Sequence, residues 1–118
     1  MKKLGVLKTH QMLQFDFGKS SVAVYAIKIF TGDDPVNGRH MKSVIFYGSN
    51  DGQQWESIAQ WNGIPLNSPN VNDNLILRSK NTRYYHFMKM QVLENYKGSN
   101  ELYLKQIEFF GNVQRINK

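Results

Sequence analysis

The stretch "YGSNDGQQWESI", residues 47–58, joins two runs of strand-forming residues through a short turn. Asn50, Asp51 and Gly52 suit that turn, because Asn and Asp bond to nearby backbone and Gly accepts the positive φ of tight hairpins. Asp51 has no second carboxylate close by in the sequence, so a calcium-holding loop is poorly supported. The pattern after the turn places Trp55 and Ile58 where a strand fills a core. We therefore predict a hairpin whose tryptophan is a core anchor.

Beyond this hairpin, the chain alternates between short strand-like runs and polar turns. Residues 12–17 alternate apolar and polar side chains, and the later runs are rich in β-branched and aromatic residues. No window of useful length has the 3.6-residue period of a helix. Strands at this spacing are typical of one antiparallel β-sandwich or barrel. The predicted strands cover residues 12–17, 22–30, 42–49, 54–61, 75–79, 83–93 and 102–111.

The bulk composition fits a single globular domain. The chain has 118 residues, of which 41% are hydrophobic and 20% charged, and that is enough to bury one core. It has no cysteine, which excludes a disulfide framework and any thiolate metal site. No apolar run approaches the length of a membrane span, and the opening "MKKLGVLKTHQ" lacks the apolar stretch of a signal peptide. We expect neither a transmembrane segment nor a secretion signal.

The net charge of +6 comes mainly from the two ends of the chain. Residues 1–10 contribute three lysines, and Arg115 and Lys118 lie near the C-terminus. Residues 11–114 hold ten Lys or Arg against nine Asp or Glu, a net charge of +1. A domain that binds a polyanion carries its basic stripe on the folded body. The charge distribution therefore predicts no specific binding of nucleic acid.

Three motifs in the right order resemble the discoidin family, also called coagulation factor V/VIII type C. They are "MLQFDFGKSSVAVYAIKI", "NGRHMKSVIFYGSNDGQQWESI" and "NTRYYHFMKMQVLENYKGSNELYLKQIEFFG", which together cover roughly residues 12–111. The second is most similar to the family's bacterial carbohydrate-binding modules. The resemblance implies an antiparallel jelly-roll β-sandwich of the galactose-binding type over residues 12–113. Residues 1–11 would form a basic tail or short strand, and residues 114–118 a C-terminal tail.

The N-terminal region departs from the family pattern. Members usually carry an Asp-Gly pair, then Thr or Ser and a Trp, ahead of the strand that matches "LQFDFG", whereas only "MKKLGVLKTHQ" precedes it here. By resemblance, a structural calcium ion would take ligands from that segment and from a glutamate matching Glu108. With the segment reduced, we interpret Glu108 as a remnant of a calcium site and expect no cofactor.

The resemblance also implies ligand binding through loops at one end of the sandwich. A sugar site needs an aromatic face and a few fixed polar groups. Each candidate also has a purely structural interpretation: a tryptophan packed on the sandwich rim, turn-forming asparagines, or an ordinary surface arginine and histidine. The candidate ligand-binding residues are Arg39, His40, Trp61, Asn95, Tyr96 and Asn100.

Enzyme interpretations have little support in the sequence. The histidines His10, His40 and His86 lie on separate segments without metal-binding spacing, and no nucleophile or nucleotide motif is present. Six aromatic residues within the predicted strands are expected to pack in the core or on the sheets. They are Tyr25, Phe46, Tyr84, Phe87, Phe109 and Phe110.

Two functions from different classes remain open on the sequence. One is a non-catalytic module that recognises a glycan or glycoprotein. The other is an assembly domain without a sugar site, for example in a phage virion, which the missing signal and the basic tails favour. A sugar binder needs Trp61 or Tyr96 exposed among polar groups, whereas an assembly domain shows a wider apolar patch or an oligomer. The resemblance favours an extracellular, cell-surface or virion location, and the loops lack the apolar spikes of a lipid binder.

Overall fold

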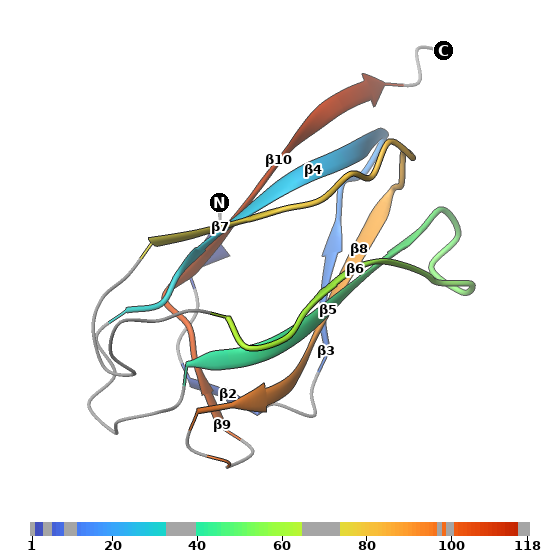
Figure 1. Cartoon of the computed structure of the whole chain (residues 1–118). Helices are drawn as coiled ribbons and strands as arrows, with labels where there is room; N and C mark the ends of the chain where they lie inside the picture. Colours follow the sequence, from blue (N-terminus) through green and yellow to red (C-terminus); the bar gives the residue numbers. More distant parts are fainter. Residues whose placement is uncertain are drawn as a thin grey trace.

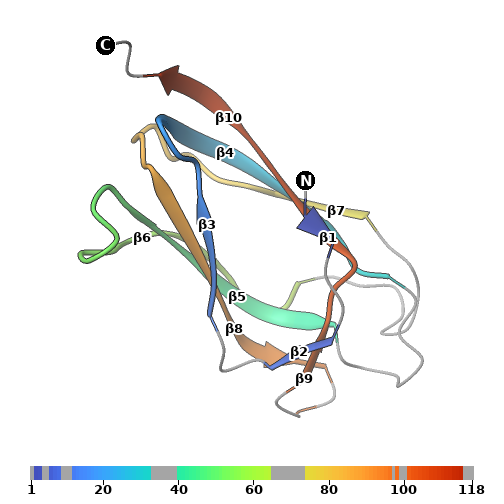
Figure 2. The same ribbon diagram turned by 180° about the vertical axis from the view of Figure 1, so that it is seen from behind.

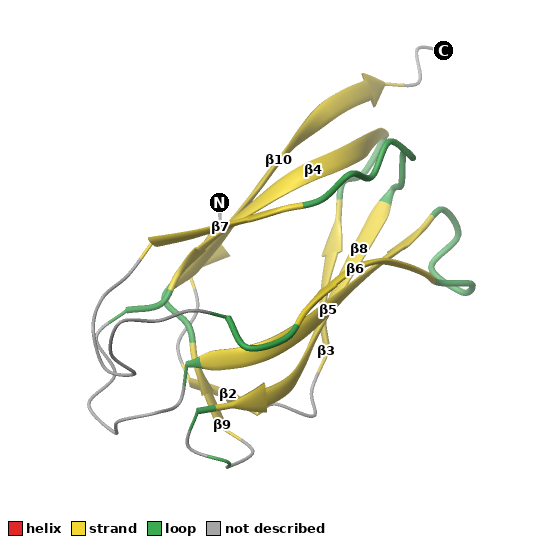
Figure 3. Cartoon of the chain, in the orientation of Figure 1, coloured by secondary structure: helices red, strands yellow, loops and turns green. Residues whose placement is uncertain are grey.

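The computed structural model describes residues 2–3, 6–8, 12–32, 40–64, 74–96, 98 and 101–115. All regular structure within these residues is β-strand, as Figure 3 shows. No helix in the described part is long and apolar enough to span a membrane. The strands are β1 (Lys2–Lys3), β2 (Val6–Lys8), β3 (Met12–Asp16), β4 (Ser20–Phe30), β5 (Met41–Ser49), β6 (Glu56–Trp61), β7 (Asn74–Arg78), β8 (Phe87–Asn95), β9 (Glu101–Tyr103) and β10 (Gln106–Arg115).

The strands form two facing antiparallel sheets, which confirms the predicted all-β sandwich. One sheet has the order β1-β10-β4-β7 and the other β3-β8-β5-β6, while β2 and β9 pair by themselves. Figures 1 and 2 show the two four-stranded sheets as separate layers seen from opposite sides. Strands β4 and β5 lie inside their sheets and are the most buried, since each packs on the opposite layer and has neighbours on both edges.

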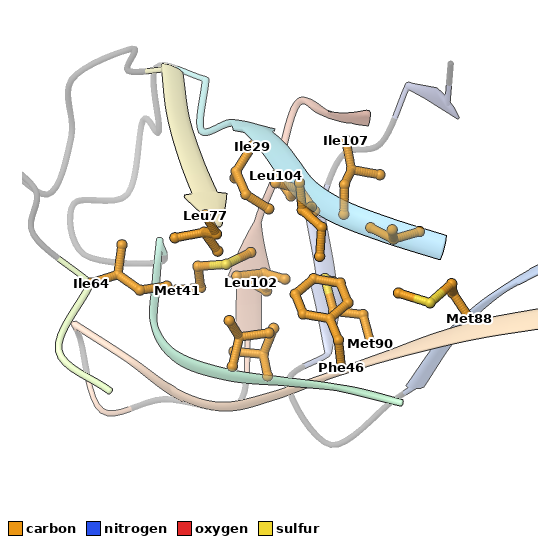
Figure 4. Close-up of a cluster of buried hydrophobic side chains, with 14 of the residues drawn as sticks. Ile29, Met41, Phe46, Ile64, Leu77, Met88, Met90, Leu102, Leu104 and Ile107 are labelled. Atoms are coloured by element: carbon orange, nitrogen blue, oxygen red, sulfur yellow. The ribbon is translucent and has the colours of Figure 1, made fainter. Parts of the chain in front are cut away.

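The core fills the space between the layers. In β5, Val44 and Phe46 are buried, and in β8 Met88, Met90 and Val92 alternate with more exposed residues. This period of two places one face of each strand in the core. Each such side chain contributes about 1.5–3 kcal/mol when it leaves water. The buried cluster drawn in Figure 4 includes Ile29, Met41, Phe46, Ile64, Leu77, Met88, Met90, Leu102, Leu104 and Ile107.

Several predicted boundaries differ from the structure. The run 83–93 becomes a strand only at Phe87, because the preceding residues form a turn around Asn81. The run 102–111 is divided into β9 and β10, since Lys105 N donates to Phe30 O outside the ladder. Strand β10 continues to Arg115, beyond residue 113, and residues 1–11, expected as a basic tail or short strand, contain the short strands β1 and β2.

Trp55 is not the core anchor that the sequence predicts. It precedes β6, is partly exposed and lies outside the buried cluster, whereas Ile58 packs against that cluster. The β5–β6 register shifts so that Phe46 lies opposite Ala59 and Tyr47 opposite Ser57, which leaves Ile58 as the extra residue of a bulge. A bulge reverses the inward and outward alternation. Trp55 therefore lies on the outside, with Lys89 Nζ 4.1 Å from its ring centroid.

The six aromatic residues predicted to pack in strands divide between the core and the surface. Phe46 is buried, and Phe109 packs against the core cluster. Tyr25, Tyr84 and Phe110 are exposed instead. Tyr25 and Phe110 lie on strands whose buried side is fixed by the opposite sheet, whereas Tyr84 lies in the segment before β8.

Candidate functional site

Most of the predicted ligand residues lie at one end of the sandwich, here called the loop end. Strands β4, β6 and β8 finish there, and β5, β7 and β9 begin there, because consecutive strands run in opposite directions. Arg39 and Asn100 lie outside the described residues. The other four candidates, His40, Trp61, Asn95 and Tyr96, are described and occupy different environments.

Tyr96 connects three segments at the loop end. Its backbone N–H donates to His40 O at 3.2 Å, and its hydroxyl donates to Ile64 O. Ile64 N in turn donates to Lys42 O at 2.7 Å. The Tyr96 side chain is nevertheless 38% exposed. These bonds hold a half-exposed aromatic ring in one position between the start of β5 and the segment after β6.

A charged pair that sequence reasoning missed reaches this ring through its lysine. Lys42 Nζ is 5.8 Å from the Tyr96 ring centroid and 3.9 Å from Glu94 Oε2. Ser43 Oγ donates to Glu94 Oε1 at 3.3 Å. Both charged side chains are about half exposed, so the pair contributes little to stability and its groups remain accessible to a polar ligand. The β5–β8 pairing brings Lys42 and Glu94 together, and no local pattern in the sequence indicates it.

The Trp61 side chain packs against the core more than it offers an open ring for a sugar to stack on. It lies opposite Val44 in the β5–β6 ladder and packs against the buried cluster. Its ring meets Phe46 edge to face, with centroids 5.8 Å apart and planes at 78°. This geometry matches the structural interpretation of Trp61 as a rim aromatic. Next to it, Gln60 Nε2 donates to Asn62 Oδ1 at 3.1 Å on the surface.

His40 and Asn95 are buried, contrary to the expectation that they face a ligand. Their exposed fractions are 0% and 2%. His40 lies directly before β5, with its ring 6.2 Å from the Tyr103 ring centroid. Asn95 ends β8 opposite Met41, inside the ladder and not in the loop that follows. Both side chains are enclosed by neighbouring strands, so neither is offered to a ligand at the surface.

Glu108 lies on the side of the sandwich, away from the loop end. It is on β10 opposite Lys28, and it lines a groove of about 500 Å³ between β3 and β10 together with Asp16. Asp16 Oδ1 already accepts the Gly18 N–H at 2.7 Å. No group of three or more His, Asp or Glu that could hold a metal occurs among the described residues. The side chains of residues 1–11, the segment that by resemblance would supply further calcium ligands, lie outside the described ones, so the calcium remnant at Glu108 stays a prediction.

The opposite end of the sandwich, here called the turn end, holds a polar cluster around a cavity of about 390 Å³. Arg83 Nη1 lies 2.8 Å from Glu56 Oε2, and the Tyr85 hydroxyl donates to Glu56 Oε1 at 3.1 Å. Burial and this carboxylate raise the pKa of Tyr85. The Tyr85 ring lies on Gly48, where any Cβ would be 2.5 Å from it. Tyr85 and its partners thus close this end of the core.

The hairpin turn at the same end is held by Asp51. Its Oδ1 accepts the N–H groups of Gln53 and Gln54 at 2.8 and 2.9 Å, and Ser49 Oγ donates to it at 3.0 Å. The backbone N–H groups of Gln54 and then Gln53 favour the ionised carboxylate and lower the pKa of Asp51. Gly52 has a φ of 74°, as predicted for a tight turn. The polar groups of this turn are committed to the fold.

No protein-family model matches this chain, and no curated protein matches it significantly. The fold is similar to that of solved carbohydrate-binding modules. The C-terminal domain of a chitobiase from Bacteroides fragilis superposes with a TM-score of 0.68 at 22% identity, covering 88% of this chain and 64% of that one. A CBM32 module from Clostridium perfringens in complex with GalNAc-β-1,3-galactose gives 0.66 at 15% identity, covering 93% and 68%.

A further similar structure is a CBM32 module of a family 31 glycoside hydrolase bound to GalNAc. It gives a TM-score of 0.62 at 14% identity and covers 89% of this chain and 66% of that one. The chain thus spans 64% to 68% of the length of these three solved chains. At such identities the similarity shows the fold alone, an antiparallel β-sandwich like that of the CBM32 modules.

Proposed function

We propose that this chain is a non-catalytic carbohydrate-binding module that recognises a glycan at its loop end. The observation that carries the proposal is the Tyr96 ring, which is half exposed yet fixed by hydrogen bonds to the segments on either side. A pyranose presents a C–H face that stacks on an aromatic ring and hydroxyls that need polar partners. Lys42, near that ring, and its partner Glu94 supply a donor and an acceptor.

The similar structures support this proposal. Two of the solved CBM32 modules hold GalNAc or a GalNAc-containing disaccharide, and they share this sandwich. The turn end is the less suitable site, because Glu56, Tyr85 and Asp51 direct their polar groups into the fold. A single module with one stacking ring binds weakly, so useful avidity requires several copies or neighbouring modules.

The test is a glycan array of the purified chain together with Tyr96→Ala and the matched control Tyr84→Ala. Tyr84 is 37% exposed, close to the 38% of Tyr96, but it lies at the turn end. We expect binding to a terminal sugar that Tyr96→Ala weakens at least about fivefold, since aromatic contacts of this kind contribute roughly 1 kcal/mol or more. Tyr84→Ala should bind like the wild type.

A blank array from a folded wild-type protein would contradict the proposal. Equal loss in the two variants would also contradict it, because the effect would then not belong to the loop end. Lys42→Ala and Glu94→Ala extend the test to the polar partners, and each should weaken binding while leaving unfolding by urea nearly unchanged.

A further inference from the structure

The sheet β3-β8-β5-β6 has a second face, here called the outer face, which points away from the opposite layer (Figure 1). Met88 and Met90 of β8 are buried, so Lys89 between them points to the outer face. Lys89 lies opposite Tyr47 of β5 on one side and opposite Gln14 of β3 on the other. Residues directly opposite each other in antiparallel strands share a face. An ordered row of side chains therefore crosses the outer face.

Two aromatic rings hold the Lys89 ammonium in place. Lys89 Nζ lies 4.1 Å from the Trp55 ring centroid and 5.5 Å from the Tyr47 ring centroid. The Tyr47 hydroxyl donates to Gln91 Oε1 at 3.3 Å, and this bond fixes the second ring. A ring face attracts a cation without supplying an oxygen that accepts its N–H groups. The ammonium is thus positioned while it keeps donors for a ligand.

No carboxylate of this sheet forms an ion pair with that ammonium in the part of the chain that the structure describes. The four strands carry three carboxylates, and each has a partner of its own. Glu94 forms an ion pair with Lys42, and Glu56 forms one with Arg83. Asp16 accepts a backbone N–H at 2.7 Å. A positioned cation whose neighbours are engaged elsewhere favours an anionic group from outside.

The side chains around the ammonium suit the hydroxyls of a sugar. Gln91 lies opposite Ile45, which in turn lies opposite Gln60 of β6, so a second row runs beside the first. Ser57 extends the first row on β6, and Gln14 is exposed at its other end. Amides and hydroxyls both donate and accept hydrogen bonds. Such groups beside partly exposed ring surface are the combination that a pyranose needs.

We propose that the outer face is a second glycan-binding surface, which takes a sugar that bears a carboxylate. The carboxylate accepts hydrogen bonds from Lys89 Nζ, and the C–H surface of the pyranose contacts the part of the Trp55 ring that the lysine leaves open. The amides of Gln14 and Gln91, on either side, bind hydroxyls. This surface lies on the strands and not at the loop end, so it goes beyond the proposed function.

An array of oligosaccharides that end in glucuronate, galacturonate or N-acetylneuraminate, each printed beside its neutral methyl ester, tests the surface. The wild type should bind at least one of the acids, and the corresponding ester at least about tenfold more weakly. That factor is typical of losing a hydrogen bond to a charged group. Lys89→Gln should lower the affinity for the acid by a similar factor and leave the affinity for the ester nearly unchanged.

The matched control is Lys28→Gln on the other sheet. Lys28 Nζ lies 4.9 Å from the Phe30 ring centroid, so this variant also removes one lysine charge from an aromatic ring. It should bind the acid like the wild type. Trp55→Ala should weaken binding of the acid and of its ester, because it removes the ring contact that both sugars use. Thermal unfolding checks that each variant folds.

Tyr96→Ala separates the outer face from the loop end, and it should leave binding of the acid unchanged. Loss of acid binding in Tyr96→Ala but not in Lys89→Gln would overturn the proposal and assign the acid to the loop end. Equal losses in Lys28→Gln and Lys89→Gln would overturn it as well, because net charge would then explain the effect. A folded wild type that binds none of the acids would also overturn it, whatever the neutral sugars show, and the loop end would still be judged by its own test.

Discussion

The turn end and the loop end are built from similar residues but use them differently. At the turn end, Asp51 accepts hydrogen bonds from backbone N–H groups and stabilises the hairpin turn. Glu56 accepts a hydrogen bond from the Tyr85 hydroxyl and helps to close the core. At the loop end, hydrogen bonds hold the Tyr96 backbone and hydroxyl, while the ring and the neighbouring charges of Lys42 and Glu94 face water. A tyrosine is structural at one end and available for binding at the other, and burial decides which.

The largest expected effect is the loss of the turn-end tyrosine. Tyr85 is buried on Gly48, so Tyr85→Ala should lower the free energy of unfolding by about 3–5 kcal/mol, as for other large-to-small aromatic substitutions in a core. Tyr84→Ala, at the exposed neighbour, should change it by less than about 1 kcal/mol. Urea unfolding measures both values. Similar losses in the two variants would mean that Tyr85 does not close the core.

Removing one hydroxyl at each end compares their roles directly. Tyr96→Phe deletes the bond to the buried Ile64 carbonyl, and Tyr85→Phe deletes the bond to Glu56. Each should cost about 1 kcal/mol in unfolding free energy. Only Tyr96→Phe should also weaken sugar binding, measured by titration calorimetry, because its ring is then less firmly held. If Tyr85→Phe weakened binding as much, the functional difference between the two ends would not hold.

The strand pattern could be predicted from the sequence because it is local. Alternating side chains in β4, β5 and β8 show which positions share a face, and the Asn-Asp-Gly turn identifies the central hairpin. The prediction that Trp55 lies in the core is wrong because the bulge at Ile58 reverses which side chains of the strand point inward. Bulges have no reliable signature in a single sequence.

The candidate site was harder to predict because it depends on contacts between distant segments. His40 is buried because Tyr103, more than sixty residues later, lies beside it, and Asn95 is buried because it pairs with Met41. Lys42 and Glu94 meet only through the β5–β8 pairing, which contains register shifts near Ser43. Tyr96 stays a predicted ligand residue, and its partly exposed, hydrogen-bonded position could be seen only in the structure.

The smallest expected effect concerns the pH dependence of the turn end. The pKa of Asp51 is lowered from its ordinary value of 3.8, so the folded state favours the carboxylate more than the unfolded state does. Its contribution to stability is complete above about pH 4 and is lost as the pH falls through the lowered pKa. Asp51→Asn should therefore be less stable than the wild type near neutral pH, and the gap should close on acidification. Urea midpoints between about pH 6 and pH 2 measure this.

Gln54→Ala is the matched control for the Asp51 prediction. It keeps the backbone N–H that bonds to Asp51, so the acid dependence of its stability should follow the wild type. Parallel curves for Asp51→Asn and the wild type would show that the carboxylate does not hold the turn, and the comparison between the two ends would then rest on Tyr85 and Glu56 alone.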